Sequence, residues 1–248
     1  MFAGYVDSST VPSGSRHVFA VAGVIAPVDG WHKQFAPAWE EALAREGIPW
    51  FHMTDYEARK AEPYKSWANE KHTGFLAKLI NVIERAEPIG GAVALDLEAY
   101  HRLPTKQRQR IGHPYKFCGA LLLTRLSIML ARDLNTFDQV AYVFESGDMG
   151  SGELKKAVDS LSEDRKRTLL IQSFAYGSKG NFIQLQVADM VAYEAAKSAV
   201  RDIGADDRWP RKSLLAMLRI MPQGGYLFDE QTLNRWVADD RDPFGFRE

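Results

Sequence analysis

Acidic side chains follow three apolar, strand-like stretches of the sequence. Asp7 closes the first stretch, Asp96 ends the segment 89–96, and Glu145 lies near the end of the segment 139–146. Side chains alternate between the two faces of a strand, and ligands of open α/β sheets bind beyond the strand ends. These three carboxylates are therefore candidates for one site. For each acid taken singly, the alternative is an ordinary turn after the strand.

A fourth acid, Asp189, lies on a helix predicted over residues 184–200. Its neighbours one turn away include no lysine or arginine that could pair with it; they are Leu185, Gln186, Ala192 and Tyr193. An unpaired carboxylate on an apolar, inward-facing side is costly unless a cation or a group of donors meets it. The alternative is a carboxylate favoured by the dipole near the helix start.

Carboxylates that meet at one end of a sheet predict a bound cation. They repel one another and raise one another's pKa unless positive charge lies between them. Their hard oxygen atoms suit Mg²⁺ or Mn²⁺. Two-metal sites, with ions about 3.5–4 Å apart, hold the attacking water and the leaving oxygen of a phosphodiester. Such a site needs acids from the first strand, a later strand and a late helix, and this sequence has acids in those places.

Two further groups have polar side chains suited to phosphate. The stretch from Ala99 to Arg132 is basic and contains no Asp or Glu; Lys106, Arg108 and Arg110 in it could neutralise phosphates, or form a solvated basic face. His52, set between aromatic and apolar residues, could orient a water or bind a phosphate, or make a structural hydrogen bond. The glycine-rich connection 147–152 lacks the end of a P-loop, and a flexible connection is the favoured interpretation.

The elements that must position these groups alternate between strands and helices, which predicts an α/β domain with a largely buried sheet. The predicted strands cover residues 2–7, 17–26, 89–96, 139–146 and 168–176. The predicted helices cover residues 31–46, 68–86, 115–134, 151–162 and 184–200. Residues 1–200 are expected to form this domain, and residues 201–248 a C-terminal helical extension packed on it, with helices near 211–220 and 229–238.

Composition limits the class of protein. The 248 residues are 46% hydrophobic and 25% charged, with 31 Lys and Arg against 32 Asp and Glu. This mixture excludes a disordered or fibrous chain and a uniformly basic protein. No segment is long and apolar enough for a membrane span. The single cysteine, Cys118, cannot form an internal disulfide, so a cytoplasmic protein is expected.

Several short motifs resemble the bacterial and phage family known as domain of unknown function 3800. They are Tyr-Val-Asp-Ser-Ser at 5–9, Phe-His-Met at 51–53, Val-Phe-Glu at 143–145, Ser-Lys at 178–179 and Gln-Val-Ala-Asp-Met-Val-Ala at 186–192. The family is regarded as ribonuclease-H-like in fold, with an acidic active site. The resemblance runs over most of residues 2–197, and the helix motif at 186–192 is the most specific part.

The resemblance implies roles for particular residues. Asp7, Glu145 and Asp189 correspond to the metal-binding acids, and Asp96 is a reserve ligand outside the family motifs. Residues adjacent to the site would be Ser178, Lys179, Gln186 and His52. The family usually has Glu-Ser-Gly after its first Asp, where this chain has Ser8-Ser9-Thr10, and its middle acid is usually Asp.

The expected function is a Mg²⁺- or Mn²⁺-dependent phosphodiesterase, a nuclease, acting on nucleic acid. Lys179, or a residue of the basic stretch 102–116, would stabilise the charge that develops on the phosphate. The sequence does not distinguish DNA from RNA. The alternative is a catalytically inactive ribonuclease-H-like component of a phage-related or defence system that binds nucleic acid or protein, which the missing acid at position 8 favours. A homodimer could form through the aromatic helix 31–46 or the C-terminal segment.

Overall fold

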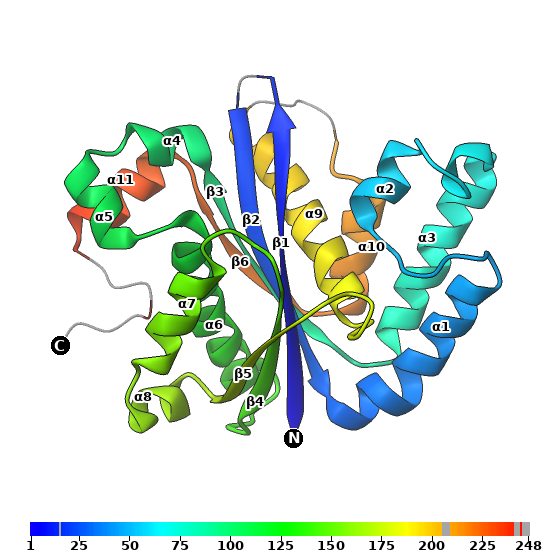
Figure 1. Ribbon diagram of the computed structural model, residues 1–248, viewed down its shortest axis with the longest axis horizontal. Helices are drawn as coiled ribbons and strands as arrows, with labels where there is room; N and C mark the ends of the chain where they lie inside the picture. The colour runs from blue at the N-terminus through cyan, green and yellow to red at the C-terminus, as the bar shows by residue number, and fades with distance from the viewer. Residues whose placement is uncertain (15, 205–208, 241–243, 245–248) are drawn as a thin grey trace.

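The computed structural model describes residues 1–14, 16–204, 209–240 and 244. In it, six strands form one mixed sheet in the order β5-β4-β1-β2-β3-β6 (Figure 1). The strands are β1 (Phe2–Ser13), β2 (Arg16–Pro27), β3 (Ile89–Asp96), β4 (Val140–Glu145), β5 (Ile171–Gly177) and β6 (Gln223–Phe228). Strand β2 runs antiparallel to β1 and β3, whereas β4 is parallel to β1 and to β5. The predicted α/β fold with a helix-flanked mixed sheet is confirmed, and the order is consistent with a ribonuclease-H-like fold.

Helices cover both faces of the sheet (Figure 1). One face carries a π-helical segment η1 (Gly30–Phe35), α1 (Ala36–Ala44), α2 (Met53–Ala58), the short 3₁₀ turn η2 (Tyr64–Ser66), α3 (Asn69–Glu84), α9 (Leu185–Asp202) and α10 (Lys212–Ile220). The other face carries α4 (Leu97–Arg102), α5 (Thr105–Ile111), α6 (Pro114–Asp133), α7 (Ser151–Asp159), α8 (Glu163–Thr168) and α11 (Glu230–Ala238). Helix α9 packs on β1 and β2, and α6 packs on β2 and β3.

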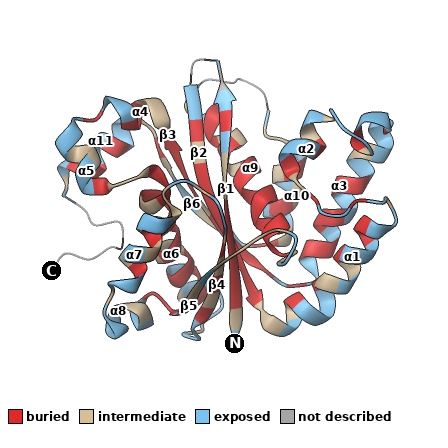
Figure 2. Ribbon diagram, in the orientation of Figure 1, coloured by how far each residue is buried: buried red, intermediate tan, exposed pale blue. Residues whose placement is uncertain are grey.

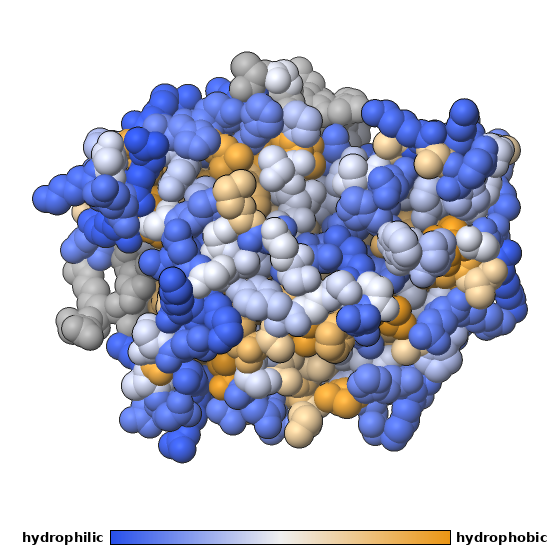
Figure 3. Space-filling view, viewed as in Figure 1, coloured by the Kyte–Doolittle hydropathy of each residue, from blue (hydrophilic) through white to orange (hydrophobic). Residues whose placement is uncertain are grey.

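Each layer of helices buries its own apolar core against the sheet, as the buried inner sides of the helices show (Figure 2). The outer sides of the helices carry mostly hydrophilic residues (Figure 3). The aromatic stripe Trp31, Phe35 and Trp39 is completely buried in the core beside α9. These side chains belong to the core, so they are not available to the homodimer interface for which they were a candidate.

The C-terminal segment differs from the prediction because it contributes a strand as well as helices. Helices α10 and α11 lie where the sequence predicts them, but between them β6 pairs in parallel with β3 at the sheet edge. A glycine pair hides this strand from pattern analysis, because Gly-Gly is typical of turns. Here Gly225 is required by packing, since a Cβ atom at this position would overlap the carbonyl oxygen of Ala92 on β3.

Within the described residues, no helix combines the length and apolar character needed to cross a membrane.

Candidate functional site

Two of the predicted acids are brought together by the parallel pairing of β1 and β4. The register ends at Val6 beside Phe144, so that Asp7 and Glu145 are the next residues along the two strands. Asp7 lies in the middle of β1 rather than at its end, because the β1–β2 hairpin continues to Ser13. Beyond Glu145 the neighbouring strand stops, which opens a crevice beside Asp7. Sheet geometry therefore explains why these two carboxylates meet.

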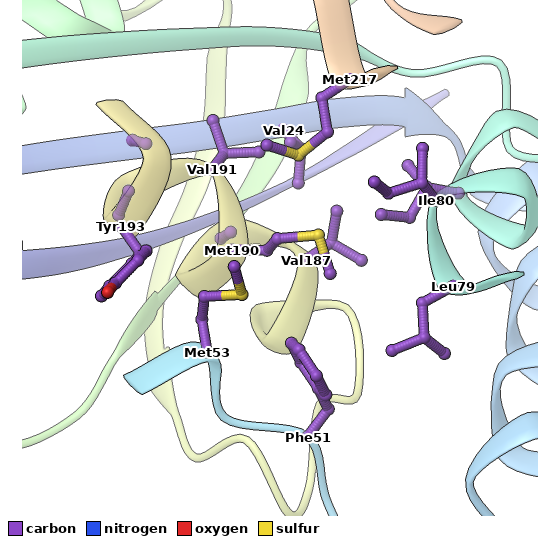
Figure 4. Packing of buried hydrophobic residues seen from close by; sticks show 14 of the residues in the cluster. Val24, Phe51, Met53, Leu79, Ile80, Val187, Met190, Val191, Tyr193 and Met217 are labelled. Carbon is purple, nitrogen blue, oxygen red and sulfur yellow. The ribbon is translucent and has the colours of Figure 1, made fainter. Parts of the chain in front are cut away.

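Asp189 reaches the same crevice from the first turns of α9. It is buried, and its Oδ2 accepts a hydrogen bond of 2.6 Å from the backbone amide of Met53 at the start of α2. Figure 4 shows Phe51 and Met53 packed beside Val187 and Met190 of α9, which fixes this segment against the helix. The amide donor and the apolar packing hold Asp189 toward β1.

Lys179 stands between the three acids. It lies in the loop that joins β5 to α9, and its side chain is only 17% exposed. Its Nζ is 2.8 Å from Asp7 Oδ2, 3.1 Å from Glu145 Oε2 and 3.2 Å from Asp189 Oδ1. Side chains from two strands, a helix and a loop thus converge on one ammonium group. The sequence prediction that these three acids meet is correct in geometry, but the positive charge between them comes from the chain itself.

One ammonium group does not neutralise three carboxylates. Burial raises the pKa of Asp7 well above its usual range, and the nearby Asp189 and Glu145 raise it further against the opposing effect of Lys179. Burial also raises the pKa of Glu145. For Lys179, burial disfavours the charge, but Asp189, Asp7 and Glu145 outweigh it and raise its pKa. The lysine is therefore charged at neutral pH, and the raised pKa values of Asp7 and Glu145 show that acids outnumbering one ammonium group tend to take up protons.

A further acid, Asp148, lines the same crevice and was not selected from the sequence. It follows β4 in the glycine-containing connection to α7, and its Oδ2 accepts a 2.8 Å hydrogen bond from Ser8 Oγ. The backbone amide of Ser8 donates to Asp7 Oδ1 at 2.7 Å. Ser8, which stands where the family that the motifs resemble usually has Glu, thus contacts two carboxylates. Burial raises the pKa of Asp148, and the hydrogen bond from Ser8 and the charge of Lys179 oppose this effect.

His52 lies at the rim of the site, as the sequence suggested. Its Nε2 is 3.5 Å from Asp189 Oδ1, and its Nδ1 is 3.0 Å from Asp55 Oδ2 on the opposite side of the ring. The imidazole is 35% exposed, so it can meet a ligand while the two acids fix its orientation. A cavity of about 430 Å³ is lined by four acids and by other polar side chains, which include Asp7, Glu145, Asp148, Asp189, His52, Lys179, Ser8 and Thr54.

Gln186 does not line this cavity, and its expected contact with substrate is replaced by a structural role. The side chain is fully buried; Oε1 accepts hydrogen bonds from Trp39 Nε1 and the Phe51 amide, both at 2.9 Å. Its Nε2 donates to the carbonyl of Lys179 at 3.0 Å. Gln186 therefore ties the lysine loop to the segment before α2. Ser178 begins the tight turn of the same loop, where its carbonyl accepts the amides of Asn181 and Phe182.

Asp96 and the basic stretch lie elsewhere. Asp96 is two strands from Asp7 and four residues, or about 13 Å, further along β3. It caps α4 through bonds to the amides of Glu98 and Ala99, so the proposal of a reserve metal ligand is wrong. Helix α5, which carries Lys106, Arg108 and Arg110, packs on the opposite face of the sheet from the acids, and Arg110 pairs with Asp240.

A scan of protein-family models and a search of curated proteins both find no match to this sequence. Among the residues that the structure describes, no group of three or more His, Cys, Asp or Glu side chains is arranged as it stands to hold a metal ion. The ammonium group of Lys179 occupies the point on which the three acids converge.

Proposed function

We propose that this protein is a Mg²⁺- or Mn²⁺-dependent phosphodiesterase that cleaves nucleic acid and belongs to the ribonuclease-H-like family that its motifs resemble. One observation carries the proposal: Asp7, Glu145 and Asp189, from β1, β4 and α9, meet around a single positive charge. Neighbouring buried carboxylates repel one another and destabilise a fold, so a cluster of them indicates a functional site.

The donor atoms are of the type that a hard divalent cation prefers, although Lys179 lies among them in this arrangement. Asp7 Oδ2 and Glu145 Oε2 are buried and have no hydrogen-bond partner of good geometry among the described residues, so the ion pair with Lys179 is their main compensation. Carboxylate oxygens of this kind are what Mg²⁺ and Mn²⁺ prefer. Asp7, Glu145 and Asp189 would hold the cation, and Lys179 would have to withdraw to admit it. When bound, such a cation supplies Lewis acidity and lowers the pKa of water.

The protein's own side chains would complete the site. Withdrawn from the acids, Lys179 keeps its charge and can pair with a phosphate oxygen of the substrate. His52, oriented by Asp55, can hold or give up a proton at Nε2, at the edge of the cavity. The buried position of Asp7 and Asp189 excludes bulk water, which strengthens each of these interactions.

The second candidate is a ribonuclease-H-like protein that binds nucleic acid or protein without cleaving it. Lys179 at the point of convergence favours this candidate, because a lysine that remains there makes a cation unnecessary. The two candidates differ in whether the ammonium leaves the acids when a divalent cation is present.

Cleavage of labelled DNA and RNA in Mg²⁺, Mn²⁺ and EDTA tests the proposal, together with the melting temperature in each. If the protein is a nuclease, the wild type cleaves only when the metal is present, and Asp189→Asn does not cleave. This variant should still fold, because an asparagine oxygen can accept the hydrogen bond from the Met53 amide. A matched control is Asp164→Asn, an exposed acid on α8. Wild type without cleavage, and with the same melting temperature in Mn²⁺ and EDTA, would support the binding protein instead.

A further inference from the structure

Ser8 makes two hydrogen bonds that hold two acids of the cavity. Its backbone amide donates to Asp7 Oδ1, and its hydroxyl donates to Asp148 Oδ2 across a sequence separation of 140 residues. Because Ser8 follows Asp7 on a rigid central strand, this pair of bonds fixes Asp148 relative to Asp7. The amide bond does not depend on the side chain at position 8, whereas the hydroxyl bond does.

The alternative explanation for Asp148 is a helix cap, since it comes three residues before α7. The geometry opposes that explanation. The N-cap residue of α7 is Gly150, and no side chain caps the helix there. The Asp148 carboxylate instead points to Ser8 and lines the cavity of the other acids. The position of this half-buried side chain is therefore set by the site rather than by α7.

Asp148 has no ion pair of its own with a described lysine or arginine. Lys179 pairs with Asp7, Glu145 and Asp189. Four carboxylates thus face one ammonium group in the cavity. A hydroxyl donor orients a carboxylate but does not cancel its charge, so the arrangement leaves room for additional positive charge beside Asp148.

We propose that Asp148 is a fourth carboxylate ligand of a divalent-cation site, and that Ser8 is a positioning residue acting on it through the hydroxyl. The inference rests on the proposed function. In this arrangement Asp148, from the β4–α7 connection, takes the place of the acid that is missing directly after Asp7. Asp7 Oδ2, a buried oxygen whose contact is the Lys179 ammonium at 2.8 Å, faces the same cavity, so Asp7 and Asp148 would lie on one cation once the lysine withdraws.

The test is Mn²⁺ binding measured by calorimetry and by electron paramagnetic resonance of free Mn²⁺, with no substrate present. We expect Asp148→Asn to weaken the affinity of the wild type by about 10–100-fold, and Ser8→Ala to weaken it by about tenfold, since lost supporting hydrogen bonds have costs of this order. Ser8→Thr keeps the hydroxyl and should restore binding. The double variant S8A/D148N should bind no more weakly than D148N, because Ser8 acts through Asp148. Asp164→Asn serves as the matched control.

The outcomes separate this inference from the proposed function. If the wild type binds Mn²⁺ and D148N binds within about twofold of it, the inference is wrong and the nuclease proposal stands. Weaker binding by S8A alone, with D148N unchanged, would also overturn it, since Ser8 would then act on Asp7. A wild type that binds no Mn²⁺ overturns both. The melting temperature of each variant in EDTA shows whether the fold is intact. D148N should be at least as stable as the wild type, because it removes one half-buried charge that has no ion pair of its own among the described residues.

Discussion

Replacing Lys179 by methionine tests the electrostatics of the site most directly. The substitution keeps much of the side-chain volume but removes the ammonium group that lies 2.8–3.2 Å from three carboxylates. Removing one partner of a buried ion pair leaves uncompensated charge in a poorly solvated place. K179M should therefore be markedly less stable than the wild type in the absence of divalent cations.

The size of this effect follows from burial and from proton uptake. Breaking a buried pair costs about 3–5 kcal/mol, and Lys179 is 17% exposed, so the pair counts as buried. Asp7 and Glu145 already have raised pKa values and can bind protons once the ammonium is gone, which limits the loss. We therefore expect K179M to lose about 3 kcal/mol of unfolding free energy, which corresponds to a decrease in melting temperature of about 6–12 °C for a domain of this size.

Thermal unfolding in EDTA at neutral pH and at pH 5 measures this loss. The difference between K179M and wild type should shrink at pH 5, because the carboxylates become neutral. Mn²⁺ should then raise the melting temperature of K179M more than that of the wild type, since the cation no longer competes with an ammonium group. The exposed Lys78→Met is the matched control. A K179M protein as stable as K78M in EDTA would refute the assignment of Lys179 as the counter-ion.

The remaining predictions concern pH and the supporting bonds. Because the pKa of Asp7 and of Glu145 is higher in the folded than in the unfolded chain, their contribution to stability is complete below about pH 4 and is lost as the pH rises through the folded-state pKa. Asp7→Asn should accordingly be more stable than the wild type in EDTA at pH 7, by about 0.5–2 kcal/mol, with the difference vanishing near pH 4 in thermal unfolding; a constant difference would contradict the raised pKa. Gln186→Leu leaves the buried donors of Trp39 and Phe51 unpaired, so urea unfolding should show a decrease of about 2–6 kcal/mol in the free energy of unfolding. A decrease below about 1 kcal/mol would contradict the structural role of the Gln186 hydrogen bonds.

Much of the fold follows from local patterns in the sequence. The strand at 89–96 and the helices near 115–134 and 184–200 lie within a residue or two of their predicted limits, because each is a predominantly apolar, largely buried run of residues. Short helices such as α4 and α8 escape that signal, since six residues do not complete two turns. Strand β1 is longer than predicted because its second half is polar and is held by pairing with β2 rather than by burial on both faces.

The site could be predicted to the extent that each acid belongs to a regular element. The first strand, β4 and α9 are rigid, and their mutual placement follows from the sheet order, so Asp7, Glu145 and Asp189 could be chosen from alternation and from the lack of a local partner for Asp189. Asp96 satisfied the same pattern and was wrong, because a strand-end acid can equally cap the following helix. Nothing local distinguishes these two outcomes.

Asp148 could not be predicted, because its role depends on one long-range hydrogen bond. It lies in a glycine-containing connection whose sequence indicates only a flexible link, and the hydroxyl that orients it belongs to a strand 140 residues earlier. A serine in place of an acid after Asp7 looks like the loss of a ligand when the sequence is read along the chain. In space, that serine directs a different carboxylate into the same cavity. The count of acids around the site is thus a property of the fold, and a departure from a linear motif is weak evidence for loss of activity until the neighbouring loops are placed.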